Sequence, residues 1–520
     1  MAARQQSIRS TSTSTQSKAI DFWRGAALKW RSVPHKEKKI AYVAGGTSIA
    51  LFGLLLVNSD NRVKEPADAH DVKALSRIPL GKIFTGWVAF AFCSSPTWVD
   101  MSETLYNVLS KIPIVSSITQ SIVMKVFFNQ FLGGETTEDC MPKIQALRKG
   151  HIGTLLGYNI EAELDGTSKD PELIRVQVQH VLESIETQAQ LGRKFYPDTS
   201  ATSGDNRSWV RIKVTGLLPQ PVALRHGSSA ILEARESKGL DMNVPYPGLP
   251  HDGDWEAALN GNQVTSSDRQ QLVDLYTTLD TIMKKGREHN VRVIVDAEQT
   301  WYQPIIDSLT DELMQKYSTL DGPATCVASF QAYLRRFPQL LDQQVLRAHE
   351  KGYKLLFKQV RGAYIKSEEE RWVKEGRQGP GPKTLATVNT QIQETGHSEI
   401  GAVFATHNSH SIDLGIRLLE KHGLAKRRSG DGKIIVSNEA AGSIVFGQLY
   451  GRFCNSGMKD DLTNRIAGFI ATEDGCPLVI KSMSYGDLKE CLPFLARRAT
   501  ENKAVLEGRG GASAEDQVWS

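Results

Sequence analysis

Short apolar runs alternate with longer amphipathic segments from residue 153 almost to the end of the chain. Runs that are apolar at nearly every position are typical of strands buried on both faces, and amphipathic helices between them cover a parallel sheet. The pattern predicts strands at Gly153–Asn159, Val210–Leu218, Val291–Glu298, Thr325–Leu334, Lys354–Gly362, Gly401–Asn408, Ile444–Gly451 and Pro477–Tyr485. It predicts helices at Glu172–Gln190, Asp268–His289, Gln303–Tyr317, Gln339–Lys351, Thr384–Thr395, Ser411–Lys421 and Asp487–Leu506.

Eight strand–helix units over residues 151–506 fit a closed α/β barrel, a (β/α)8 barrel, better than an open sheet. An open, doubly wound sheet is the alternative fold. No Gly-x-Gly-x-x-Gly or Walker loop follows any predicted strand, which counts against it. We expect insertions at 196–208, 237–265, 376–382 and 424–433, and the connection Gly451–Gly475, including 459–475, shows no clear pattern.

The chain before the barrel divides into segments of different composition. Residues 1–39 hold nine Lys and Arg against two acidic residues, and 1–20 contain no acid, which is typical of a mitochondrial presequence. A disordered Ser/Thr tail is the alternative interpretation. Residues 40–57 are uncharged and long enough for a transmembrane helix, although a second part of an import signal also fits. We expect a linker and helical region at 58–150 and a flexible tail at 507–520.

The net charge of +4 is unevenly distributed, because residues 1–39 carry +7 and residues 40–520 carry −3. A body without excess positive charge offers no surface for nucleic acid. The six cysteines stand singly, without the paired spacing of a zinc site or the density of a secreted disulfide scaffold. We therefore expect free thiols in a reducing compartment.

In a barrel of this kind the carboxyl ends of the strands face the active site. Here these positions are unusually polar: Lys213, Asp296, Glu298, Gln331, Tyr333, Lys358, Arg361, Tyr364, His407, Gln448 and Tyr485. Lys213 and Asp296 alternate with apolar neighbours, so both should point inward and form an ion pair. His407 is followed by His410, but no further ligand cluster accompanies them, so we expect no metal site.

Arg497 and Arg498 are adjacent on the last predicted helix. Neighbouring guanidinium groups repel each other unless an anion lies between them, and their planar forks suit a carboxylate. A solvated surface is the usual alternative for such a pair. Cations outnumber acids at these positions and the strand ends, which indicates an anionic small molecule, an anionic cofactor or both. No residue stands out as a general acid or base, which favours chemistry supplied by a cofactor.

Five motifs in this region resemble the proline dehydrogenase family. They are Val295-Asp296-Ala297-Glu298-Gln299-Thr300 followed by Gln303-Pro304, then Val360-Arg361-Gly362-Ala363-Tyr364, Ala405-Thr406-His407-Asn408, Gly447-Gln448-Leu449-Tyr450-Gly451, and Leu495-Ala496-Arg497-Arg498-Ala499-Thr500-Glu501-Asn502. The similarity covers roughly residues 120–506, whereas residues 1–70 have no clear counterpart.

The resemblance implies a distorted eight-stranded barrel that binds FAD and oxidises L-proline to Δ1-pyrroline-5-carboxylate. Electrons would pass to ubiquinone at the mitochondrial inner membrane; no oligomeric state is implied. Arg497 and Arg498 would bind the proline carboxylate with Lys213, which Asp296 would hold in place, while Tyr485 and Leu449 would pack on the pyrrolidine ring. The resemblance places the following residues at the flavin: Gln331, Lys358, Val360, Arg361, Ala363, His407 and Glu501.

Some residues depart from the family pattern. Phe494 stands where a Tyr is expected, and Lys358 stands where bacterial members carry an Arg. Tyr485 favours proline over 4-hydroxyproline, because the hydroxyproline branch looks to carry a smaller residue there. The alternatives are a hydroxyproline dehydrogenase, a flavin barrel similar to methylenetetrahydrofolate reductase, an aldolase-type barrel and, from another class, a membrane-anchored scaffold without catalysis.

Overall fold

The computed structural model of the chain describes residues 88–89, 92, 96–159, 170–197, 206–360, 364–374, 400–407, 409–430, 432–437, 443–451, 470–472 and 477–506. The chain divides into two compact units. Phe131–Phe494 make one unit, which we call the barrel unit. Met1–Gln130 and Leu495–Ser520 make the other, the helical unit.

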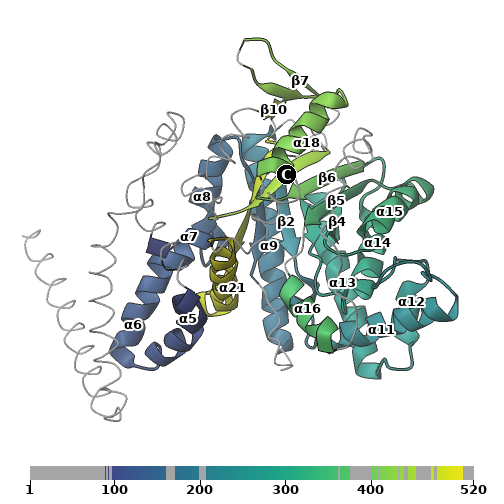
Figure 1. The fold of residues 1–520 in the computed structure, drawn as a ribbon, viewed down its shortest axis with the longest axis horizontal. Helices are drawn as coiled ribbons and strands as arrows, with labels where there is room; N and C mark the ends of the chain where they lie inside the picture. Colours follow the sequence, from purple (N-terminus) through teal and green to yellow (C-terminus); the bar gives the residue numbers. More distant parts are fainter. Residues whose placement is uncertain are drawn as a thin grey trace, which may run out of the picture. The chain divides into compact units, whose positions relative to one another are not determined.

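The barrel unit is built around a closed barrel of parallel strands (Figure 1). The strands are β1 (Gly153–Tyr158), β2 (Ser208–Ile212), β3 (Arg292–Val295), β4 (Cys326–Gln331), β5 (Leu355–Val360), β6 (Ile400–Ala405), β9 (Ile444–Leu449) and β11 (Val479–Tyr485). Their order around the barrel is β1-β11-β9-β6-β5-β4-β3-β2. The predicted (β/α)8 fold and all of its strands are confirmed. The largest boundary difference is in β2, which ends at Ile212 because Val214–Gly216 form a 3₁₀ turn.

Helices precede β1, occupy connections between the barrel strands and follow β11. They are α8 (Thr137–Lys149), α9 (Pro171–Phe195), α11 (Val222–Ser237), α12 (Asp254–Asn260), α13 (Ser266–Glu288), α14 (Gln303–Tyr317), α15 (Phe337–Lys351), α16 (Ile365–Lys374), α18 (Ser409–Lys421) and α21 (Leu488–Leu506). All predicted helices are confirmed except 384–395, which lies outside the described residues. Capping residues fix several helix starts; at α13, for example, Thr265 and Asp268 form a reciprocal capping box. The pattern missed α11, α12 and α16.

A second sheet was not predicted. It contains β7 (Ala425–Arg427), β8 (Ile434–Val436) and β10 (Ile470–Thr472), in the order β10-β8-β7. The sequence pattern assigned 424–433 to a loop and gave no structure to 451–475. Each strand has only three residues, which is too short for an alternating pattern to be recognised. Because β8 precedes β9 and β10 follows it, the sheet joins the two connections that flank β9.

The insertion 237–265 is anchored to the barrel helices by buried arginines. Arg235 donates two hydrogen bonds to the carboxylate of Asp254, at 2.6 and 3.2 Å. Arg336 donates to the carbonyl of Gly248 at 2.6 Å. Hydrogen bonds from a buried charged donor are stronger than neutral ones. The insertion is therefore a fixed part of the barrel's outer shell.

One layer of apolar side chains fills the barrel interior. Each barrel strand contributes one residue to it: Leu155, Trp209, Ile294, Val327, Leu356, Val403, Val445 and Ile480. A larger core lies between the outer faces of the strands and the helices, and it includes Val295, Ala328 and Phe330. The barrel is thus a packed core on both sides of its wall, as this architecture requires.

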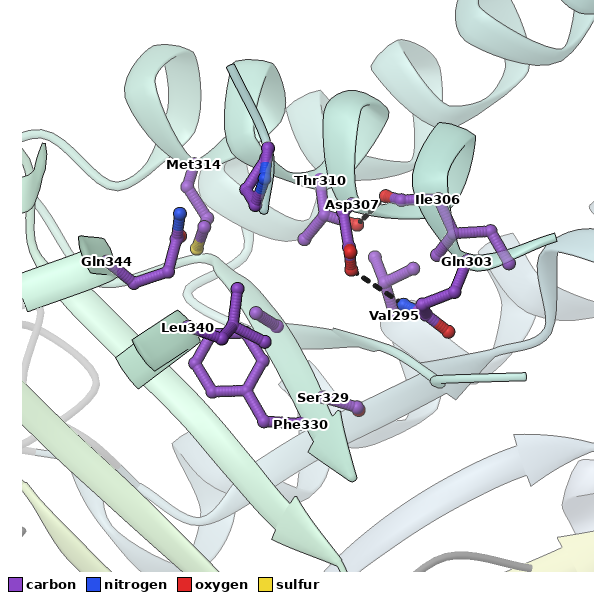
Figure 2. A pocket seen from close by; sticks show the side chains of 12 residues that line it. Val295, Gln303, Ile306, Asp307, Thr310, Met314, Ser329, Phe330, Leu340 and Gln344 are labelled. Carbon is purple, nitrogen blue, oxygen red and sulfur yellow. Dashed lines mark hydrogen bonds between the residues drawn. The ribbon is translucent and has the colours of Figure 1, made fainter. Parts of the chain in front are cut away.

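A cavity of about 10 Å³ lies between β3, β4, α14 and α15 (Figure 2). Its lining includes the outward-facing residues Val295, Ala328 and Phe330, so it lies behind the barrel wall. Within the described residues, the buried Nε2 of Gln344 has no hydrogen-bond partner there. A polar cavity of this size suits one ordered water molecule and is too small for a substrate.

The helical unit contains α5 (Pro96–Leu109), α6 (Pro113–Ile122), the π-helix η2 (Val123–Phe128) and the end of α21. Val99 of α5 packs on Ala499 of α21. In the part of the chain that the structure describes, no helix combines the length and hydrophobicity needed to cross a bilayer. The predicted segments 1–39, 40–57 and 507–520 lie outside the described residues.

The described cysteines Cys140, Cys326 and Cys491 are free and buried. Burial raises the pKa of the Cys140 thiol to about 12. A thiol held in its neutral form is a poor nucleophile. Cys140 therefore acts as a small apolar side chain.

Glu312 of α14 gives the fold a dependence on pH. Burial, with Glu256 and Asp311 nearby, raises the pKa of its carboxyl to about 7. A folded-state pKa above the unfolded value means that stability present at low pH is lost as the pH rises through about 7. We expect Glu312→Gln to raise the free energy of unfolding at about pH 8 by about 1 kcal/mol, discounted because the group is only partly buried.

Urea denaturation at about pH 4 and about pH 8 measures this effect. At the lower pH the variant and the natural protein should have the same free energy of unfolding, because the Glu312 carboxyl is protonated in both the folded and the unfolded state. Glu350→Gln, a change at an exposed position of α15, is the matched control and should alter neither value. If Glu312→Gln raises the free energy of unfolding equally at both pH values, ionisation of Glu312 is not the cause of the increase.

Candidate active site at the carboxyl rim of the barrel

Polar residues replace the apolar layer toward the carboxyl ends of the strands. Side chains alternate along a strand, so positions two residues beyond the apolar layer also face the interior. These positions are Gly157, Arg211, Asp296, Ser329, Lys358, Ala405, Gly447 and Ser482. Two residues further, at the rim, lie Asn159, Lys213, Glu298, Gln331, Val360, His407, Leu449 and Ser484. The structure therefore brings the predicted site residues Lys213, Gln331, Val360, His407 and Leu449 to one level of the barrel.

Asp296 is the centre of a charged cluster. Its Oδ1 accepts a hydrogen bond from the ammonium of Lys358, and its Oδ2 lies 3.3 Å from a terminal nitrogen of Arg211. Burial alone would raise the pKa of Asp296, but Lys358, Arg211 and Lys213 outweigh it and hold that pKa below its usual range. Asp296 is therefore an ionised carboxylate surrounded by cations.

Lys358 experiences the opposite balance. Burial lowers the pKa of its ammonium, and the charges of Arg211 and Lys213 add to this, whereas Asp296 opposes it. The side chains of Lys358 and Asp296 are only 11% and 13% exposed. In such an enclosed site Asp296 is the group that favours the charged form of Lys358 against the effect of burial.

Arg211 lies two residues before Lys213 and was not predicted as a site residue. In the structure it donates to Asp296 and, at 2.5 Å, to the Oγ of Ser484. The signal that could have found it was its spacing of two residues from both Trp209 and Lys213 on one strand. That spacing puts its side chain inside the barrel.

Lys213 and Glu298 lie at the rim above this cluster. The ammonium of Lys213 lies 5.9 Å from the centre of the Tyr364 ring. Glu298 accepts hydrogen bonds from the backbone N–H of Thr215, at 3.0 Å, and from its hydroxyl, at 2.5 Å. Burial raises the pKa of Glu298, although Lys213 opposes this. Lys213 therefore adds positive charge next to a carboxyl whose ionisation is disfavoured.

Gln331 presents an unused acceptor at the rim. Its Nε2 donates to the carbonyl of Glu298 at 3.0 Å and to the hydroxyl of Tyr333 at 3.3 Å, which fixes the amide orientation. Its Oε1 is buried and has no hydrogen-bond partner among the described residues. A buried acceptor without a partner costs free energy, so this position suits a ligand that carries an N–H or O–H donor.

His407 is held by the backbone of the neighbouring strand. The N–H of Leu449 donates to its Nε2 at 2.9 Å. Because Nε2 accepts, the proton of the neutral ring lies on Nδ1. His407 is thus arranged as a hydrogen-bonding residue, and the described residues contain no cluster of His, Cys or acidic side chains that could hold a metal ion.

Tyr485 lies on the outer side of the barrel wall, contrary to the expectation that it packs on a substrate ring. Its hydroxyl donates to the carbonyl of His180 at 2.8 Å and lies 2.7 Å from the Oγ of Ser184, both on α9. Its ring is fully buried and contacts Tyr158 edge-on. The inward positions of β11 are Ser482 and Ser484, because side chains alternate from Ile480. Packing of Tyr485 on the substrate ring does not fit this geometry. Tyr485 therefore gives no reason to favour proline over 4-hydroxyproline.

The remaining predicted site residues lie elsewhere in the chain. Arg497 and Arg498 are on α21, in the part that belongs to the helical unit, and Arg498 is 8% exposed. Arg361, Ala363 and the side chain of Glu501 lie outside the described residues.

Sequence reasoning also missed Glu368. This fully buried residue of α16 accepts hydrogen bonds from the N–H and the hydroxyl of Thr300, at 2.7 and 2.6 Å. Trp372 on the same helix donates to it at 3.1 Å. These bonds tie α16 to the loop after β3, which carries Asp296 and Glu298. A fully buried acid shows no pattern in the sequence that separates it from the exposed acids beside it.

Together, these residues define a (β/α)8 barrel whose interior carries a cluster of buried cations toward the carboxyl ends of its strands. A model of the family described as "Proline dehydrogenase" matches residues 140–508. The chain belongs to the proline dehydrogenase family, whose members are oxidoreductases.

Individual relatives agree with this assignment. The chain is 26% identical to "Proline dehydrogenase 1, mitochondrial" of Dictyostelium discoideum over 456 residues, covering 84% of this chain and 71% of the relative. It is 23% identical to the Caenorhabditis elegans protein of the same name, covering 83% of this chain and 84% of the relative. It is also 25% identical to "Hydroxyproline dehydrogenase" of Mus musculus, covering 78% and 83%.

Solved structures support the fold. The crystal structure of proline utilization A (PutA) from Bdellovibrio bacteriovorus, inactivated by N-propargylglycine, superposes with a TM-score of 0.55 at 16% identity. The match covers 84% of this chain, which spans only 38% of that longer protein.

Asp296→Asn tests the charged cluster. The substitution leaves Lys358 and Arg211 buried without a counter-charge, so we expect the free energy of unfolding to fall by about 3–5 kcal/mol. Asp252→Asn is the matched control, because Asp252 is 65% exposed and pairs with Arg347 and Lys351 at the surface. The control should lose less than about 1 kcal/mol in urea denaturation. Equal losses in the two variants would show that the cluster contributes no more than a surface ion pair.

Proposed function

We propose that this protein catalyses the FAD-dependent oxidation of L-proline to Δ1-pyrroline-5-carboxylate and passes the electrons to ubiquinone. Family membership supports the reaction class. The observation in this chain that carries the proposal is the excess of positive charge toward the carboxyl ends of the strands, where Arg211 and Lys358, with Lys213 at the rim above them, surround Asp296. Such a site suits an anionic substrate beside an anionic cofactor.

The rim residues fit a flavin. The Oε1 of Gln331 is a buried acceptor without a partner among the described residues, and an isoalloxazine ring carries an N–H donor. Lys358 would supply a cation to a bound flavin from one level below the rim at which His407 and Val360 lie. Arg361, Ala363 and Glu501 are included on the resemblance alone. When bound, FAD supplies the two-electron acceptor that no side chain here provides.

The proposed role of the protein in the reaction is to bind and orient the substrate. Arg497 and Arg498, with Lys213, would hold the proline carboxylate, and Leu449 would provide an apolar seat for the ring. The oxidation removes a hydride from the ring carbon next to nitrogen and a proton from the nitrogen, which leaves a C=N bond. The amine must be neutral for this, so the rate should rise with pH.

Arg498→Ala tests the carboxylate clamp. Loss of one charge-assisted contact of about 3 kcal/mol should raise the KM for L-proline by about two orders of magnitude. Anaerobic bleaching of the flavin band by L-proline measures the reaction without a quinone. Arg427→Ala, at a side chain that is 57% exposed and pairs with Glu420, is the control and should keep the natural KM. An unchanged KM in Arg498→Ala would remove the clamp assignment.

The same assay distinguishes the alternatives. Oxidation of 4-hydroxyproline is a second candidate function, because relatives named hydroxyproline dehydrogenase match over most of the chain and Tyr485 lies behind the barrel wall. A higher kcat/KM for trans-4-hydroxy-L-proline than for L-proline would favour it. A yellow protein that bleaches with neither but reacts with a reduced pterin would favour a methylenetetrahydrofolate reductase-like barrel, and a colourless protein would favour a scaffold.

We further propose that the protein acts at the mitochondrial inner membrane. The relatives named mitochondrial and the basic residues 1–39 support the compartment. Apolar side chains on α5 and α6 support contact with lipid: Met101, Val108, Ile118 and Ile122 are 52%, 41%, 57% and 49% exposed. Residues 104–134 contain two Lys and no acid, which suits an anionic lipid surface.

Vesicle sedimentation tests this contact. The full-length protein should sediment with vesicles that contain phosphatidylglycerol more than with phosphatidylcholine alone. The double change Ile118→Glu and Ile122→Glu should weaken sedimentation by about tenfold, because each charge must be buried at the interface. Leu346→Glu, at an exposed apolar position on α15, is the control and should bind like the natural protein. Equal weakening in both variants would contradict a role for α6.

A further inference from the structure

Arg211 links strands that are not adjacent. The strand order places β1 between β2 and β11. Nevertheless, the guanidinium of Arg211 on β2 donates to the Oγ of Ser484 on β11, at 2.5 Å. Its other terminal nitrogen lies 3.3 Å from the Oδ2 of Asp296, one residue beyond β3. One side chain therefore spans from β11 to β3 across the barrel interior.

Gly157 provides the space for this crossing. In the β1–β11 register Gly157 is paired with Ser484. A Cβ atom at Gly157 would lie 2.7 Å from the Cγ and 2.8 Å from the Nε of Arg211. Contacts this short do not occur in folded proteins, so any other residue at 157 would displace the Arg211 side chain.

The two oxygens of Asp296 are divided between two cations. Oδ2 faces Arg211 and Oδ1 faces Lys358. The side chains of Arg211 and Asp296 are 10% and 13% exposed, so little water competes for these bonds. A planar guanidinium anchored at a second point is a rigid support, which limits rotation of the carboxylate and hence the position of the Lys358 ammonium.

We propose that Arg211 is a positioning residue for the oxidation described above: lying over Gly157 and anchored on Ser484, it orients Asp296 so that Lys358 is held just below the rim where the flavin would bind. This inference rests on the proposed function. Arg211 acts through Asp296 and Lys358 and contacts neither substrate nor cofactor in this role. Among the described residues, Lys213 and Glu298 also face the cluster with charged groups.

Four variants of the full-length FAD-loaded protein test the proposal: Arg211→Met, Arg211→Lys, Gly157→Ala and Ser484→Ala. Arg211→Met should lower kcat for L-proline by about 10- to 100-fold with little change in KM, because positioning is lost and substrate contacts remain. Arg211→Lys should recover part of the activity. Gly157→Ala should reproduce the loss, and Gly157→Ala with Arg211→Met should be no worse than Arg211→Met alone.

The pH profile separates positioning from a merely structural role. The Arg211 cation lowers the pKa of the Lys358 ammonium. Arg211→Met should therefore raise that pKa, and the fall in kcat that deprotonation of Lys358 causes at high pH should move to higher pH. Arg175→Met, at an arginine whose side chain is 75% exposed, is the matched control and should change neither kcat nor the profile. A lower melting temperature with unchanged kcat and pH profile would overturn the proposal.

The outcomes separate this inference from the proposed function. A natural protein that binds FAD but does not oxidise L-proline refutes the function. A natural protein that oxidises L-proline, with variants that keep its kcat and pH profile, refutes the role of Arg211. If Arg211→Met fails to fold, Gly157→Ala and Ser484→Ala test the proposal instead. Each of them shifts or removes one contact of Arg211 and keeps its positive charge. An unchanged kcat in both variants refutes the proposal.

Discussion

The site depends on one buried carboxylate. Asp296 is the acid to which Lys358 and Arg211 are bonded and to which Lys213 is electrostatically coupled. Buried cations are stable only when a negative charge compensates their loss of hydration. Three bases face Asp296, and the pKa of the second acid, Glu298, is raised, so the cluster has an excess of positive charge that would favour an anionic ligand. The same carboxylate therefore stabilises the empty barrel and sets the charge that a ligand meets.

The barrel supplies this arrangement through strand alternation. Eight apolar residues close the interior below the cluster, and the next inward position on each strand meets a dry environment. Polar groups there must be satisfied by one another or by a ligand. Asp296, Lys358 and Arg211 satisfy one another, whereas the Oε1 of Gln331 has no partner among the described residues. Residues deep in the barrel thus pair with one another, whereas a residue at the rim keeps an acceptor that a ligand could use.

The fold could be predicted from sequence because buried parallel strands and amphipathic helices leave strong periodic signals, and these located all the barrel strands. The site was predicted less completely. Alternation shows which residues face inward, but it does not show where a long lysine or arginine side chain ends, so the contact between Asp296 and Lys358 was not foreseen. Tyr485 was placed inside because its position relative to Ile480 was not considered. The β7-β8-β10 sheet was missed because three residues are too few for a period.

Gly157 and Arg211 also constrain how this lineage can change. A side chain at 157 cannot coexist with Arg211 in its observed position. An evolutionary path that replaces the glycine before residue 211 is shortened therefore passes through a protein in which Arg211 is displaced. Geometry favours the opposite order, so related barrels should carry these two positions as a correlated pair.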